Sequence, residues 1–182
     1  MNGFFNLSAF VALLGIGLLG PAVVSADLKG LNSRPMDPHD IKVMKDVAQV
    51  SVDEIELGKL GMKNGTNRFG MSFGERMVND HTEMLKEIKS LAERNDVRLP
   101  QSMDQEHRAT YAHLQVRVGK SFDKGYCKAM MTGHEKAEKM FRKEAETVTD
   151  PALKAYLEKY VPTIKTHRMI ATEVWNSFID TW

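Results

Sequence analysis

The stretch from Asp150 to Phe178 reads DPALKAYLEKYVPTIKTHRMIATEVWNSF and decides the fold class. Asp150 and Pro151 are typical of a helix start, because an aspartate side chain caps free backbone N–H groups and proline suits the first helical position. A seam then follows at intervals of four and three residues, the spacing of one helix face. It consists of Leu153, Leu157, Tyr160, Ile164, His167, Ala171, Val174 and Phe178. This pattern predicts a long amphipathic helix that runs nearly to Trp182.

Similar seams, separated by break signals, predict more helices toward the N-terminus. We expect long helices over about 38–63, 69–94 and 120–148. Ser102 and Gln105 form the sequence of a capping box that would open a shorter helix ending near 118, and Gly119 marks a bend. No segment shows the alternation of a strand. The chain is therefore predicted to be all-α.

The connections predict how these helices are arranged. Short turns join the first long helix to the second and the third to the fourth, so each pair should be antiparallel. About two dozen residues separate the second and third long helices, enough to return along the bundle. This is the topology of a ferritin-like four-helix bundle, with a crossover that contains a short extra helix between helices two and three.

The N-terminal stretch predicts export. Residues 1–26 contain no charged side chain and end in Val24-Ser25-Ala26, a pattern that signal peptidase cuts. We expect a secretory signal over 1–26, a linker over 27–37 and the bundle domain over 38–182. The alternative is an uncleaved membrane anchor, because the apolar stretch nearly suffices to span a bilayer and lacks a basic residue near its start. Both alternatives place the domain in the periplasm or outer envelope.

Composition excludes some classes of function. The formal net charge is +1, which gives no indication of nucleic-acid binding. The single Cys127 rules out an internal disulfide, so its thiol is either buried or reactive. The sequence does not indicate a protein partner.

Polar residues interrupt the apolar seams at one level. His81, His134 and His167 occupy positions where leucine would be ordinary, and Glu54 does the same in the first helix. Because all four lie near the midpoints of their helices, an aligned bundle would bring them together. Imidazole nitrogen and carboxylate oxygen suit a single divalent transition metal, with zinc or copper expected. The alternatives are a structural polar layer and a different helix register.

Neighbouring residues bear on this site. Met77, Met130 and Cys127 would favour copper(I) if they faced the metal, although methionine is also a common core filler. Asp80 could orient an imidazole. Asp123 is too far along the helix axis to bind the same ion, and we expect it to cap or join a network near Gly119. We expect four further polar residues to be exposed to solvent: His39, Asp53, His107 and His113.

Five motifs together resemble one family. They are Glu54-Ile55-Glu56-Leu57-Gly58-Lys59-Leu60, Arg76-Met77-Val78-Asn79-Asp80-His81, Gly119-Lys120-Ser121-Phe122-Asp123-Lys124-Gly125-Tyr126, His134, and Val161-Pro162-Thr163-Ile164-Lys165-Thr166-His167. Over about Asp40 to Trp182 the chain resembles the exported bacterial family called domain of unknown function 4142.

The resemblance implies a ferritin-like bundle in the periplasm or outer envelope. The family's acidic residue, Asp-His pair, Phe-Asp element and two later histidines correspond to Glu54, Asp80 with His81, Asp123, His134 and His167. Tyr126 closes the Phe-Asp motif and lies in the same seam as His134. Val161-Pro162 departs from the family's usual Leu-Pro element.

The same positions argue against a di-iron centre. Di-iron bundles place a glutamate three residues before each histidine, whereas this chain has Val78 and Ile164 there. The sequence shows no candidate nucleophile, no phosphate-binding loop and no paired catalytic base that would indicate an enzyme. We therefore expect a non-enzymatic metal-binding bundle. A structural envelope protein and a metal-dependent enzyme with an open coordination position remain the alternatives.

Overall fold

The structure, a computed structural model, describes residues 35–66 and 68–178, which form five helices and no strand. The helices are α1 (Pro38–Asn64), α2 (Arg68–Arg94), α3 (Gln105–Gln115), α4 (Gly119–Thr147) and α5 (Pro151–Ser177). The all-α prediction is confirmed. The expected signal over 1–26 and most of the expected linker lie outside the described residues. None of the described helices combines the length and apolar character needed to cross a membrane.

The starts of α1 and α5 follow the local chemistry of the sequence. Asp37 accepts a hydrogen bond from the backbone N–H of His39 at 2.8 Å, and Asp150 accepts from Ala152 and Leu153. Gly119 has a positive φ of 60°, so it forms the expected bend. The prediction for α3 was wrong, because Asp104, not Ser102, accepts from the backbone of His107. The cap of the short helix consequently lies two residues later than expected, at Asp104 in place of Ser102.

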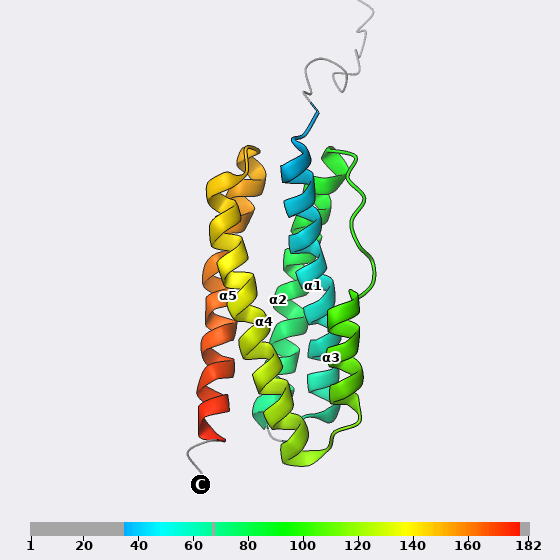
Figure 1. Ribbon diagram of the computed structural model, residues 1–182, viewed down its shortest axis with the longest axis vertical. Helices are drawn as coiled ribbons and strands as arrows, with labels where there is room; N and C mark the ends of the chain where they lie inside the picture. Colours follow the sequence, from blue (N-terminus) through cyan, green and yellow to red (C-terminus); the bar gives the residue numbers. More distant parts are fainter. Residues whose placement is uncertain (1–34, 67, 179–182) are drawn as a thin grey trace, which may run out of the picture. The chain divides into compact units, whose positions relative to one another are not determined.

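The long helices pack as two antiparallel hairpins, α1 with α2 and α4 with α5 (Figure 1). The segment after α2 runs back along the molecule and continues into α3, which lies beside α1 and also contacts α4. This segment is the crossover. It includes an extended portion before the eleven residues of α3, so less of it is helical than the sequence pattern predicted.

Two buried aspartates tie the hairpins together at opposite ends. Asp40 of α1 accepts hydrogen bonds from the backbone N–H groups of Thr149 and Asp150, in the turn between α4 and α5. Asp123 of α4 accepts from the backbone N–H and hydroxyl of Thr66, between α1 and α2. Each hairpin thus satisfies the polar backbone of the other hairpin's turn. The expectation that Asp123 joins a network near Gly119 agrees with this contact.

The interior consists of two apolar clusters with a polar layer between them. One cluster contains Met44, Ile88, Phe141 and Leu157, and the other contains Leu57, Phe73, Phe122 and Tyr126, each with further neighbours. The histidines of α2, α4 and α5 fall in the gap between these clusters, as do Ser51, Asp53 and Glu54 of α1. The polar layer therefore crosses the bundle at a level where every long helix contributes a buried polar side chain.

Candidate metal centre

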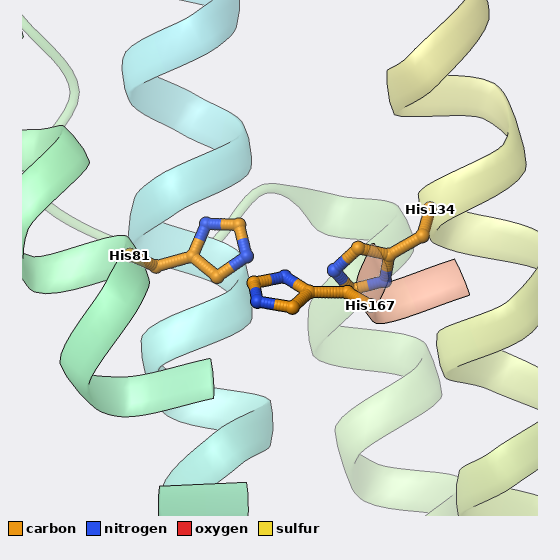
Figure 2. A group of neighbouring side chains, drawn as sticks. All are labelled: His81, His134 and His167. Atoms are coloured by element: carbon orange, nitrogen blue, oxygen red, sulfur yellow. The ribbon is translucent and has the colours of Figure 1, made fainter. Parts of the chain in front are cut away.

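Three buried imidazoles meet in the polar layer. His81 comes from α2, His134 from α4 and His167 from α5, and each is at most 1% exposed. Their ring centroids are 5.6 Å apart for His81 and His134, 5.4 Å for His81 and His167, and 5.2 Å for His134 and His167. Figure 2 shows the three rings turned toward one another. One nitrogen of each lies within 4.8 Å of the other two.

His134 has one nitrogen committed to its own helix. Its Nδ1 lies 2.9 Å from the backbone carbonyl of Met130. A carbonyl oxygen can only accept a hydrogen bond, so Nδ1 must carry the proton. The remaining nitrogen, Nε2, then presents a lone pair, and it is buried with no hydrogen-bond partner in the described part of the chain.

His167 is oriented by a carboxylate from α2. Its Nε2 lies 2.8 Å from Oδ2 of Asp80, so Nε2–H donates and Nδ1 presents the lone pair. That Nδ1 is also buried without a partner among the described residues. Asp80 precedes His81 in the sequence, yet the imidazole it contacts belongs to a different helix. Helix α5 continues through Pro162 to reach this position.

His81 contributes the least satisfied ring. Neither of its nitrogens has a hydrogen-bond partner within the described residues, although the side chain is fully buried. Burial, followed by the neighbouring His134 and His167, holds the pKa of His81 well below its ordinary value. Burial also lowers the pKa of His134 and of His167 to about 4. All three imidazoles are therefore neutral at physiological pH, which is the form that binds metal.

The donor set fits a transition metal ion. Two imidazoles present a lone pair while their other nitrogen donates to a carbonyl or carboxylate, the arrangement by which proteins hold metal-binding histidines. Buried polar atoms without partners are costly, and a Lewis acid would satisfy all three rings at once. The three facing nitrogens lie within 4.8 Å of one another, close enough to share one ion bonded at about 2.0–2.1 Å after small side-chain adjustments.

Glu54 stands beside this group and is not part of it. Its Oε1 lies 3.6 Å from Nδ1 of His134, the nitrogen turned away from the shared centre, and its Oε2 is buried without a partner in the described chain. Burial raises the pKa of Glu54 to about 8. The sequence placed Glu54 at the correct level of the bundle, and the structure puts its carboxylate behind His134.

The other residues singled out from the sequence have different surroundings. Met77 and Met130 are buried in the apolar cluster that contains Phe73, and Tyr126 stacks on Phe122 with ring centroids 5.6 Å apart. Asp123 binds Thr66, as described above. Cys127 is 1% exposed, and burial raises its pKa to about 12, so of the two alternatives its thiol is the buried one.

A second polar group escaped the sequence analysis. Asp53 is fully buried, although it was expected on a solvated face, and its Oδ1 accepts from Gln49 at 2.9 Å and from the backbone of Asp104 at 3.0 Å. His107, expected in solvent, lies 3.1 Å from Asp53 and 2.9 Å from Asp104. Asp53, and then Asp104, raise the pKa of His107 to about 9 against the effect of burial. The imidazole ring of His107 is thus a cation whose ion pairs link the crossover to α1. A protonated imidazole has no lone pair with which to bind a metal.

Comparison with known proteins gives a family and a fold. The family model described as Domain of unknown function (DUF4142) matches residues 26–174, which bears out the resemblance drawn from the motifs. The crystal structure of a DUF305 fragment from Deinococcus radiodurans is similar, with a TM-score of 0.71 and 14% sequence identity. That match covers 79% of this chain and 99% of the other, and at such identity it shows the fold alone. No curated protein sequence matches the chain.

Proposed function

The chain belongs to the DUF4142 family, and we propose that it binds a single transition metal ion, zinc or copper, through His81, His134 and His167. The observation that carries the proposal is the set of buried imidazole lone pairs that face one another with no partner among the described residues. The proposal concerns binding and does not include a catalytic step. Glu54 lies beside His134 and is not one of the three ligands.

We also propose that the bundle is of the ferritin-like type. Its support is the crossover between two antiparallel hairpins and a mid-height layer to which separate helices each contribute a side chain. Export to the periplasm or outer envelope is part of the same proposal and rests on residues 1–26. Sequencing the N-terminus of the protein recovered from the cell envelope would distinguish a cleaved signal from a retained anchor.

Metal content tests the central proposal directly. The purified protein is equilibrated with zinc or copper, freed of unbound ions and examined by elemental analysis. We expect one ion per chain for the natural sequence, and a large loss of retained metal in His81→Ala, His134→Ala and His167→Ala. His113→Ala removes an exposed imidazole of α3 and serves as the matched control. Failure of the natural protein to retain either metal would refute the proposal.

A structural role for the layer is the second candidate. The observation in its favour is that His134 and His167 already make hydrogen bonds that link or order helices without any ion. If the layer is only structural, replacing the three histidines should change the free energy of unfolding, and neither the natural protein nor the variant should bind metal. The elemental analysis separates the two roles, because only the metal-binding role gives a difference in metal content.

A further inference from the structure

A cavity of about 330 Å³ opens between α1, α3 and α4. Its rim includes Glu106 and Lys136, whose side chains are 70% and 65% exposed and lie 2.8 Å apart as an ion pair. Its wall also includes Glu54, which is 4% exposed. The cavity thus leads from charged side chains in solvent to a buried carboxylate in the polar layer.

Glu54 connects this cavity to the histidine group. None of the three histidines lines the cavity, whereas Glu54 does and also has Oε1 3.6 Å from His134. Its other oxygen, Oε2, is buried and has no hydrogen-bond partner in the described part of the chain. A buried carboxyl oxygen without a partner is costly, and a cation that displaced the carboxyl proton would satisfy it.

Gly133 keeps the space in front of Glu54 open. It lines the cavity one residue before His134, and a Cβ added there would lie 3.4 Å from Oε1 of Glu54. That distance is an ordinary contact, so alanine would fit, while a longer side chain would occupy the cavity. Helix α3 forms the opposite wall, where Thr110 faces the same space.

We propose that this cavity is the path by which a divalent cation reaches the histidine group, with Glu54 as the first buried ligand the ion meets. Carboxylate oxygens exchange readily with the water of a hydrated divalent ion, whereas imidazole nitrogens retain a transition metal more firmly. An ion held briefly by Glu54 would lie on the Nδ1 side of His134, so the ring of His134 would have to turn for Nε2 to take the ion into the final site. The inference rests on the metal-binding function proposed above and adds a route and a transfer residue to it.

Rates of metal binding test the route separately from the site. Cobalt(II) is the probe, because its visible absorption reports nitrogen ligands during rapid mixing. In Gly133→Leu we expect association and dissociation to slow by a similar factor, about tenfold or more, since an obstructed path changes both rates and leaves the affinity nearly unchanged. Thr172→Leu adds the same side chain to a groove on the outside of α5 and should keep the natural rates.

Two further variants guard against a folding defect. Thr110→Leu narrows the cavity from α3 and should slow both rates in the same way. Glu54→Gln keeps the shape of the side chain and should slow association while the cobalt spectrum of the filled site is retained. Natural rates in folded Gly133→Leu and Thr110→Leu would overturn the route. If the natural protein gives no cobalt spectrum, the metal-binding function itself fails.

Discussion

At the scale of single residues, the positions of two protons decide what the histidine group can do. The carbonyl of Met130 fixes the proton of His134 on Nδ1, and Asp80 fixes that of His167 on Nε2. Both remaining nitrogens therefore face the centre with a lone pair. His134 is oriented by its own helix, while His167 depends on a side chain from α2 that is 34% exposed. Of the two supports, Asp80 is the one a substitution can remove without changing the backbone.

Asp80→Ala should weaken metal binding and leave the fold intact. Without the carboxylate, His167 can rotate or exchange its proton between nitrogens, and removing such a partner typically costs about 10–100-fold in metal affinity. A competition titration against a chelator of known affinity measures the effect. Glu83→Ala, which removes an exposed carboxylate of the same helix, is the control and should bind as the natural protein does. Equal affinities for the two variants would contradict the role assigned to Asp80.

His107 should make the free energy of unfolding fall at alkaline pH. Its pKa is raised from 6.5 to about 9 in the folded protein, so its contribution is complete below pH 6.5 and is lost as the pH rises through about 9. The side chain is 26% exposed, and after solvent screening we expect the contribution to be about 1–2 kcal/mol. Urea unfolding of the natural protein and of His107→Gln at about pH 6 and about pH 10 measures it.

The difference between the two proteins isolates His107 from other titrating groups. It should be large at the lower pH and nearly absent at the higher one. His113→Gln removes an exposed imidazole from the same helix and should reproduce the natural pH profile. A difference that stays constant across this range would show that His107 stabilises the crossover by packing rather than by charge.

At the scale of helices, α1 and α2 approach each other closely through two glycines. A Cβ at Gly74 would lie 2.6 Å from the carbonyl oxygen of Gly58 and 2.6 Å from the backbone nitrogen of Met62. A Cβ at Gly58 would meet the carbonyl of Gly74 at 2.9 Å. These contacts are with backbone atoms, which cannot move aside independently of the helix. The close approach helps position α2, which carries His81, against α1, which carries Glu54.

Gly74→Ala should therefore destabilise the protein. Forcing the helices apart costs about 1–3 kcal/mol by overpacking, even though alanine is favoured over glycine inside a helix. Gly133→Ala is the matched control, because the added Cβ meets only a side chain at 3.4 Å, and it should stabilise by about 0.5–1 kcal/mol. Denaturant unfolding of both variants gives the comparison. Equal effects of the two substitutions would mean that α1 and α2 can separate freely.

Features that depend on nearby residues were predicted from the sequence, and features that depend on distant contacts were not. Caps and seam spacing depend on nearby residues, so the long helices were predicted to within a few positions, as Asp150 and Pro151 illustrate. The start of α3 was misplaced because Asp104 caps the helix in place of Ser102. The backbone N–H of Asp104 donates to Asp53, which is 51 residues away in the sequence, and a local pattern does not show such a contact. The common level of the histidines follows from helix lengths. Which imidazole Asp80 contacts depends on how α2 and α5 are rotated about their axes. The apolar seam of one helix does not determine that rotation.

At the scale of the whole molecule, the polar layer divides one interior into two apolar clusters. A continuous apolar seam through all four long helices would bury more hydrophobic surface and leave fewer polar atoms without partners. The layer therefore costs stability in the absence of a ligand. Proteins commonly give up stability at sites that bind or react, and the cost here is concentrated at His81, where both nitrogens lack a partner among the described residues.

His81→Leu should separate stability from function. Replacing a fully buried, unpartnered imidazole with an apolar side chain should raise the free energy of unfolding of the metal-free protein by about 1–3 kcal/mol. The natural protein should gain about 2.7 kcal/mol at an ion concentration 100 times the dissociation constant, and the variant should gain almost nothing. Met84→Leu, a buried substitution of similar volume in the same helix, should keep the metal response. Denaturant unfolding with and without zinc measures all three proteins. If His81→Leu is less stable than the natural protein without metal, the imidazole has a structural partner, and the layer contributes to folding rather than to binding.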